Sequence, residues 1–172
     1  MGGQTEAIGL LTKKGVCTSL YSTQPAKLKE LNISWYYDWG VSTPPSGVGM
    51  EYVPMIWGAG SVNGSNPRKI KDGFEKGIYK NLLTFNEPDL PEQSNMTVEQ
   101  AIALWPKLEE IGIRLGSPCP AASENYCGGW LADFMAQCQE KGYRVDFIAV
   151  HCYQDVCNSE SVASLKTLLT QI

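Results

Sequence analysis

The residues with the clearest capacity for chemistry are Asn86-Glu87-Pro88-Asp89, which directly follow an apolar run that begins at Leu83. A carboxylic acid at the end of a buried strand can protonate a glycosidic oxygen, and an adjacent amide can hydrogen-bond a sugar hydroxyl. Pro88 ends the strand because proline has no backbone N–H to donate. Taken alone, these four residues fit a tight turn equally well. The surrounding elements therefore decide between a turn and a catalytic site.

Four further polar or aromatic residues lie at or near the ends of other β-like runs. Trp39 and Trp57 could stack on sugar rings, or they could pack at the mouth of the fold. His151 could orient a carboxylate or bind a hydroxyl, and the alternative is an ordinary histidine at a strand end. Tyr153 could donate its hydroxyl toward a second carboxylate. The remaining tryptophans are better explained by core or helix packing: Trp35, Trp105 and Trp130.

Short β-like runs alternate with amphipathic stretches along the chain. Strands are predicted at residues 16–20, 34–39, 52–57, 80–85, 114–117 and 146–153. Helices are predicted at residues 24–31, 66–76, 97–111, 130–141 and 161–169. Thr97 and Gln100 fit a capping box at the start of one helix, and Gly142 ends another.

Regular alternation of strands and helices predicts an α/β fold with a parallel sheet. A doubly wound nucleotide-binding sheet usually has a glycine-rich first turn, which residues 19–23 lack. Reactive residues at strand ends favour a (β/α)8 TIM-barrel type, whose chemistry lies at the carboxyl ends of its strands. About six βα units are visible, so we expect an incomplete barrel. Residues 1–13 are predicted to be an N-terminal extension, and residues 14–172 a barrel domain that lacks its last two units.

Four segments carry a resemblance to a known family: residues 35–40, 52–58, 83–89 and 150–153, in this order. With them the chain resembles glycoside hydrolase family 128 from about Lys14 to Ile172. The resemblance implies a retaining endo-β-1,3-glucanase or a β-1,3-glucan binder that needs no cofactor. It also implies that Glu87 is the catalytic acid/base and that Asn86 contacts the substrate.

The sequence departs from this family in one important respect. The family nucleophile is a glutamate on the seventh strand, within a Trp-x-Thr-Glu-Phe-like motif that the sequence does not contain. A retaining mechanism needs two carboxyl groups about 5–5.5 Å apart. Asp38 and Asp155 are weak substitutes, because Asp38 is expected to hydrogen-bond a loop and Asp155 lies beyond its strand. The alternative is therefore a non-catalytic glucan-binding protein or an inactive fragment; a barrel lyase or isomerase is more remote.

Charge and hydropathy restrict the class of partner. The net charge is −4 and the charged residues are interspersed, so we predict no nucleic-acid partner. No apolar run reaches the ~20 residues of a membrane span. The expected partner is a β-1,3-glucan polysaccharide or oligosaccharide. We also expect self-association through the open edges of an incomplete barrel.

Cysteines and glycosylation sequons favour a secreted or cell-wall location. Asn32, Asn63 and Asn95 each begin an Asn-x-Ser/Thr sequon, and the cysteine count of six is even. Residues 1–11 show no signal peptide, so we expect that one was removed. With one histidine and no C-x2-C pair, no metal site is predicted. At least one local disulfide is expected, Cys152–Cys157 or Cys119–Cys127.

Overall fold

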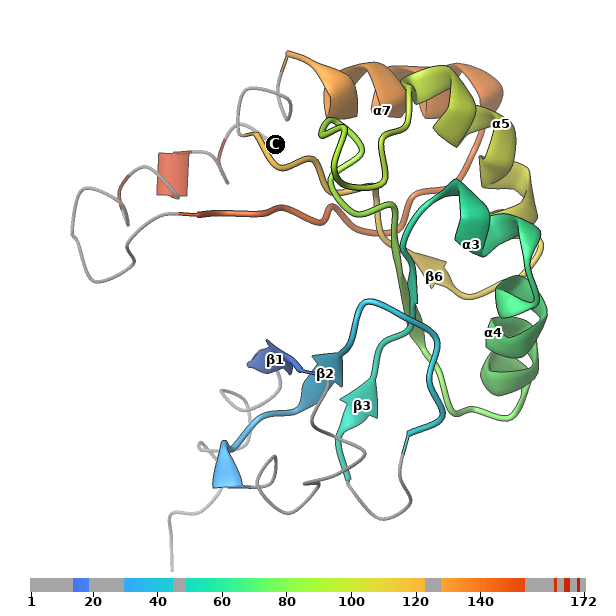
Figure 1. The fold of residues 1–172 in the computed structure, drawn as a ribbon, viewed down its shortest axis with the longest axis vertical. Coiled ribbons are helices and arrows are strands. Elements are labelled where there is room, and N and C mark those ends of the chain that lie inside the picture. Colours follow the sequence, from blue (N-terminus) through green and yellow to red (C-terminus); the bar gives the residue numbers. More distant parts are fainter. Residues whose placement is uncertain are drawn as a thin grey trace, which may run out of the picture.

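The computed structural model describes residues 14–18, 30–44, 49–122, 128–153, 163, 166, 167 and 170 (Figure 1). Its strands form two parallel three-stranded sheets in the orders β1-β2-β3 and β4-β5-β6. Their bounds are β1 Gly15–Cys17, β2 Trp35–Tyr37, β3 Glu51–Tyr52, β4 Met55–Ile56, β5 Asn81–Thr84 and β6 Arg114–Leu115. The predicted α/β class is confirmed, and barrel closure stays a prediction.

The predicted third strand is divided into β3 and β4 at Pro54. Proline has no N–H for a ladder, so a central strand is interrupted there. The two sheets nevertheless join across the break. Val53 N donates to Tyr36 O at 2.9 Å, and Leu83 N donates to Pro54 O at 3.0 Å. Residues 53 and 54 therefore link β2 with β5 through backbone hydrogen bonds on both sides of the break.

The predicted sixth strand at residues 146–153 is wrong in extent, because only Phe147 pairs, in an isolated parallel bridge to Gly116. Side chains replace the backbone partners that a ladder would need. Leu115 N donates to Asp146 Oδ2 at 2.7 Å, and Ala149 N donates to Ser117 Oγ at 3.0 Å. The segment follows the sheet edge without extending it.

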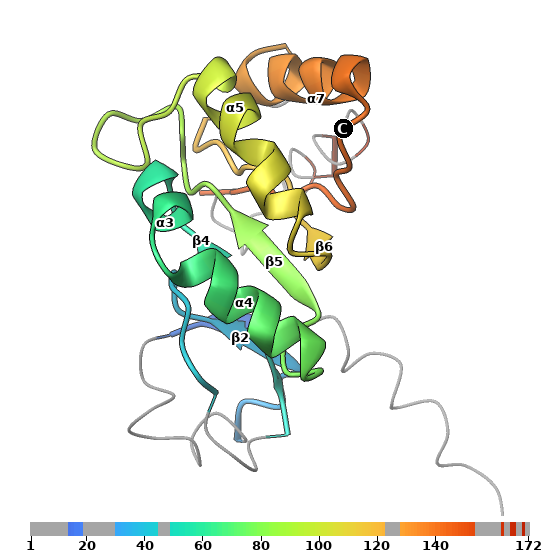
Figure 2. The same ribbon diagram turned by 90° about the vertical axis from the view of Figure 1, so that its right-hand side faces the viewer.

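Four helices are described: α3 Ala59–Asn63, α4 Asn66–Glu75, α5 Val98–Glu109 and α7 Trp130–Lys141. Figure 2 shows α4 and α5 in front of β5, with α7 against α5. The capping box is confirmed, since Thr97 Oγ1 accepts from Gln100 N and Gln100 Oε1 accepts from Thr97 N. Gly142 ends α7 at a φ of 69°, as expected. None of the described helices has the length and hydropathy of a membrane span.

The other helix predictions had mixed outcomes. α3 was missed, because its five residues, Ala-Gly-Ser-Val-Asn, are too few and too polar to show helical periodicity. Only residues 30 and 31 of the predicted helix at 24–31 are described, and Glu30 is helical. Of the predicted helix at 161–169, residues 163, 166 and 167 are described; they are helical and exposed, as is Thr170.

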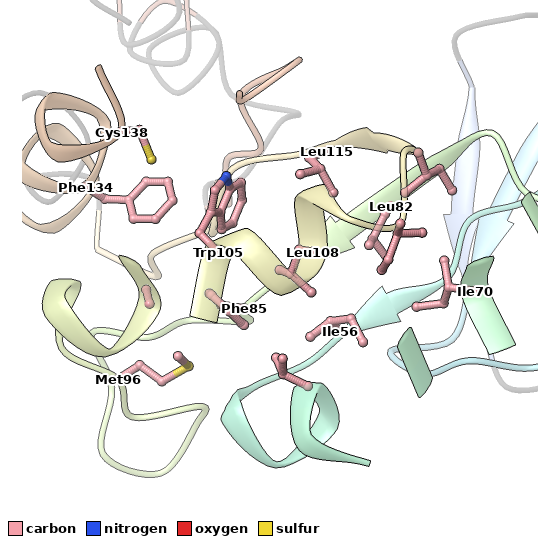
Figure 3. Packing of buried hydrophobic residues seen from close by; sticks show 14 of the residues in the cluster. Ile56, Ile70, Leu82, Phe85, Met96, Trp105, Leu108, Leu115, Phe134 and Cys138 are labelled. Atoms are coloured by element: carbon pink, nitrogen blue, oxygen red, sulfur yellow. The ribbon is translucent and has the colours of Figure 1, made fainter. Parts of the chain in front are cut away.

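The core lies between the strands and the helices (Figure 3). Trp105 is fully buried, with its ring centroid 6.2 Å from Phe85 and 4.9 Å from Phe134. Its indole Nε1 donates to Arg144 O at 3.0 Å, so its polar atom is satisfied. Trp130 stacks on Phe134, and Trp35 stacks on Tyr37. The packing interpretation is confirmed for Trp105 and Trp130, whereas half-buried Trp35 lies outside the core cluster.

Candidate active site

A cavity of about 590 Å³ lies at the carboxyl ends of the strands. It brings together all six residues that the sequence singled out: Trp39, Trp57, Asn86, Glu87, His151 and Tyr153. Five further residues line it: Cys17, Tyr37, Gln93, Val150 and Cys152. Parallel strands place their carboxyl ends at one edge of a sheet, and this arrangement explains why residues so distant in sequence meet.

Glu87 occupies a buried and conformationally unusual position. Only 5% of its surface is exposed, and its φ is 45°, a region that non-glycine residues rarely adopt. The backbone is held by neighbours on both sides, since Asn86 N donates to Trp57 O at 2.9 Å and Glu87 N donates to Cys119 O at 2.8 Å. A strained conformation of on the order of 1–3 kcal/mol that is over-determined by its surroundings is common at functional sites.

The Glu87 carboxylate is contacted on one oxygen by two ring side chains. His151 Nδ1 lies 2.7 Å from Oε1, and the Tyr153 hydroxyl donates to the same oxygen. That hydrogen bond, together with burial and the negative charge of Glu87, raises the pKa of Tyr153 to about 12. The phenol is therefore a stable donor at neutral pH. The sequence interpretation placed Tyr153 toward a second carboxylate, whereas the structure directs it to Glu87.

The aromatic wall of the cavity is formed by residues that alternate along one strand and its extension. Tyr37 lies 5.5 Å from Trp39 between ring centroids, in an edge-to-face arrangement. Burial, followed by interactions with Cys17, raises the pKa of Tyr37 well above its usual value. Tyr37 was not among the predicted site residues, although the two-residue period of a strand places it on the same face as Trp39.

The carboxylates of Asp38 and Asp89 hold nearby backbone and loop groups. Asp38 accepts from Ser42 Oγ at 2.8 Å and from Gly40 N at 3.3 Å, so it binds a loop as predicted. Asp89 accepts from the backbone N–H groups of Ala121 and Ala122 at 2.8 and 3.1 Å. Asp155 lies outside the described residues. Of the described residues that line the cavity, only Glu87 carries a carboxylate.

The two expected disulfides each involve one cysteine inside and one outside the described residues. Cys152 lines the cavity with a free thiol, so the structure does not form the expected Cys152–Cys157 disulfide. Cys127 and Cys157 lie outside the described residues, and the Cys119–Cys127 pairing stays a prediction. Within the described ranges no group of three histidine, cysteine or acidic side chains could hold a metal ion.

Comparison with known proteins identifies the family. Residues 15–171 match the family model of the glycosyl hydrolase catalytic core. The structure is also similar, with a TM-score of 0.80 and 40% identity, to a GH128 (subgroup I) endo-β-1,3-glucanase from Amycolatopsis mediterranei in complex with laminaripentaose. The chain belongs to glycoside hydrolase family 128. This membership confirms the resemblance that the four sequence segments carried.

Two further similar proteins have names that state different properties. A curdlan-specific exo-β-1,3-glucanase of subgroup III from Blastomyces gilchristii is 31% identical, with a TM-score of 0.74. Alkali-sensitive linkage protein 1 from Schizosaccharomyces pombe is 32% identical over 154 residues. The chain spans 27% of that protein, 65% of the Amycolatopsis chain and 66% of the Blastomyces chain. Conversely, these matches cover 81%, 93% and 90% of this chain.

Proposed function

We propose that the protein hydrolyses β-1,3-glucan, with Glu87 as the catalytic acid/base of a retaining mechanism. One observation carries the proposal: a buried carboxyl lies in an aromatic-walled cavity and is contacted on a single oxygen by His151 and Tyr153. The names of the similar structures support the substrate class, since they describe β-1,3-glucanases in complex with laminaripentaose or laminaritriose.

The two contacts on Oε1 suggest which oxygen carries the reactive proton. His151 and Tyr153 both meet Oε1, and no described residue donates to Oε2. A protonated Glu87 would therefore carry its proton on Oε2. That proton passes to the glycosidic oxygen as the bond from this oxygen to the sugar carbon breaks. In the second half-reaction the carboxylate takes a proton from the water that attacks the glycosyl intermediate.

The nucleophile of a retaining mechanism would have to come from residues other than those that the structure describes. It forms a bond to the anomeric carbon, and it lies about 5–5.5 Å from the acid in retaining enzymes. Glu87 has no such carboxylate partner among the described cavity residues. This observation supports a second candidate function, which is the binding of β-1,3-glucan without catalysis.

Incubation of the full-length protein with laminarin separates the two candidates. Hydrolysis creates new reducing ends and shorter oligosaccharides that mass spectrometry detects, whereas binding alone creates neither. Initial products with the β configuration, followed by NMR, would support retention. Laminarin that is bound but not shortened would refute the hydrolase and favour the binding protein.

We predict that Trp39 and Trp57 contribute binding energy through their ring faces. Trp39 is 42% exposed at the cavity, and Trp57 is half-buried beside it. Replacing either by Ala should weaken the binding of laminari-oligosaccharides by about 1 kcal/mol or more, roughly fivefold in Kd. Calorimetric titration measures the change. Phe74→Ala, at an exposed aromatic residue on α4 outside the cavity, is the matched control. Parental affinity in both tryptophan variants would show that the rings are structural.

We also propose that the protein is secreted or located in a cell wall. The sequon residues Asn32, Asn63 and Asn95 are all exposed, so each is open to N-glycosylation. Expression through a eukaryotic secretory pathway should give a product whose mass falls on treatment with an N-glycosidase. Each Asn→Gln change at a used sequon should remove one glycan, and Asn66→Gln, outside any sequon, should remove none. An unmodified mass in the secreted protein would contradict glycosylation at these sites.

A further inference from the structure

Gln93 lines the cavity beside Asn86, and the mechanism above gives it no role. We propose that Gln93 is a positioning residue of the glucan site, whose amide oxygen holds the side-chain amide of Asn86 in one of its two orientations. The proposal rests on the function proposed above, because it concerns how the same site meets a sugar hydroxyl.

The loop after Glu87 is folded so that Gln93 returns to the cavity. Leu90 N donates to Glu87 O and Gln93 N donates to Leu90 O, both at 3.1 Å. Ser94 N then donates to Asn86 O at 3.2 Å, and this bond fixes the loop beside the strand end from which it departs. These backbone bonds place Gln93 next to Asn86, although seven residues separate them in sequence.

The two side chains form a direct amide–amide hydrogen bond. Asn86 Nδ2 donates to Gln93 Oε1 at 3.1 Å, and Asn86 is 95% buried, with 5% of its surface exposed. A primary amide has two orientations that differ by exchange of its oxygen and nitrogen. In the recorded orientation Asn86 Oδ1 stays available to accept from a sugar hydroxyl. Rotating the Asn86 amide alone would set two acceptor oxygens against each other, an arrangement that costs the hydrogen bond.

The orientation of the pair has a testable consequence. If both amides rotated together, Gln93 Nε2 would donate to Asn86 Oδ1, and the sugar would meet an N–H of Asn86 instead of an oxygen. A glutamate at position 93 has only acceptor oxygens when it is ionised. It can therefore hold Asn86 in the recorded orientation but not in the opposite one. A methionine of similar length can hold neither.

The experiment compares Gln93→Met and Gln93→Glu in the full-length protein by calorimetric titration with laminaripentaose. This ligand is uncharged, so the added carboxylate does not affect its binding through net charge. We expect Gln93→Met to weaken binding by roughly three- to tenfold, the range for one lost hydrogen bond. Gln93→Glu should bind within about twofold of the parent. Gln139→Met, at an exposed glutamine on α7, controls for the substitution itself.

A second measurement excludes a merely structural effect. If Gln93 acts through Asn86, Gln93→Met in an Asn86→Ala background should cause no further loss of affinity. Additive losses would overturn the proposal, as would parental affinity in Gln93→Met. Equal losses in the Met and Glu variants would overturn the recorded orientation and thus the stated role. A parent that binds no laminaripentaose would instead refute the proposed function, so the two failures are distinguishable.

Discussion

Replacing Glu87 by Gln is expected to lower kcat on laminarin by about 10²–10⁴-fold, the usual contribution of a general acid. The amide cannot donate the proton that the departing glucosyl oxygen needs. Its carbonyl oxygen can still accept from Tyr153 and from His151, which meet one oxygen of the carboxylate in the parent. The Kd for laminari-oligosaccharides should therefore stay close to the parental value. Steady-state kinetics with reducing-end detection, together with calorimetry, measure both quantities.

The control is Glu92→Gln, which removes a carboxylate from an exposed position of the loop that follows Glu87. It should leave kcat unchanged, because Glu92 does not line the cavity. Near-parental kcat in Glu87→Gln on an unactivated glucan would show that another group supplies the proton. A substrate whose leaving group needs no proton should restore much of the lost rate, and a lack of such rescue would point to disturbed geometry instead of a missing acid.

The contacts around Glu87 also explain how one carboxyl could serve in both half-reactions. His151 and Tyr153 hold Oε1, so the second oxygen keeps one position while it loses and then regains a proton. The raised pKa of Tyr153 keeps its hydroxyl protonated across the range in which enzymes usually work. Tyr153 nevertheless has 76% of its surface exposed. Its bond to Glu87 is thus formed at the rim of the cavity, where a sugar could cover it.

The sequence predicted which residues lie together better than it predicted the elements that position them, and the roles of these residues stay predictions. All six predicted residues line one cavity, because parallel strands must bring their carboxyl ends to one edge and the chemistry-bearing residues follow the strands. Helices with clear caps were predicted to within a few residues. Thr97 and Gly142 mark their ends through local hydrogen bonding and a positive φ, and both properties depend on residue type.

Two of the features that were missed, the early end of the Phe147 pairing and the place of Gln93, depend on contacts distant in sequence. The pairing of Phe147 stops after one bridge because Ser117 and Asp146 side chains take the place of backbone groups. Gln93 lies in a loop whose sequence has no periodicity, and only the fold brings it to Asn86. The break at Pro54 had a local cause and was open to prediction, since proline rarely occupies a central strand.

The largest effect on stability is expected at Trp105, where replacement by Ala should lower the free energy of unfolding by about 3–5 kcal/mol. The indole is fully buried, its ring meets Phe85 and Phe134 edge-on, and its Nε1 donates to Arg144 O. Truncation would leave a cavity and also an unsatisfied carbonyl. Trp105→Phe should cost less, because it keeps an aromatic ring and loses chiefly the hydrogen bond and part of the volume. Urea denaturation of the three proteins measures the differences.

Because Trp105 packs against Phe85, we expect its replacement to lower turnover as well as stability. Phe85, which packs against Trp105, has a φ of 24° and lies two residues before Glu87, whose φ of 45° is similarly unusual. Such backbone conformations persist only when the surrounding packing holds them. At a temperature where it is still folded, Trp105→Ala should therefore lose turnover, whereas Trp39→Ala should lose glucan affinity with little loss of stability. Unchanged kcat in a folded but destabilised Trp105→Ala would show that the backbone of Glu87 is held by its strand hydrogen bonds alone.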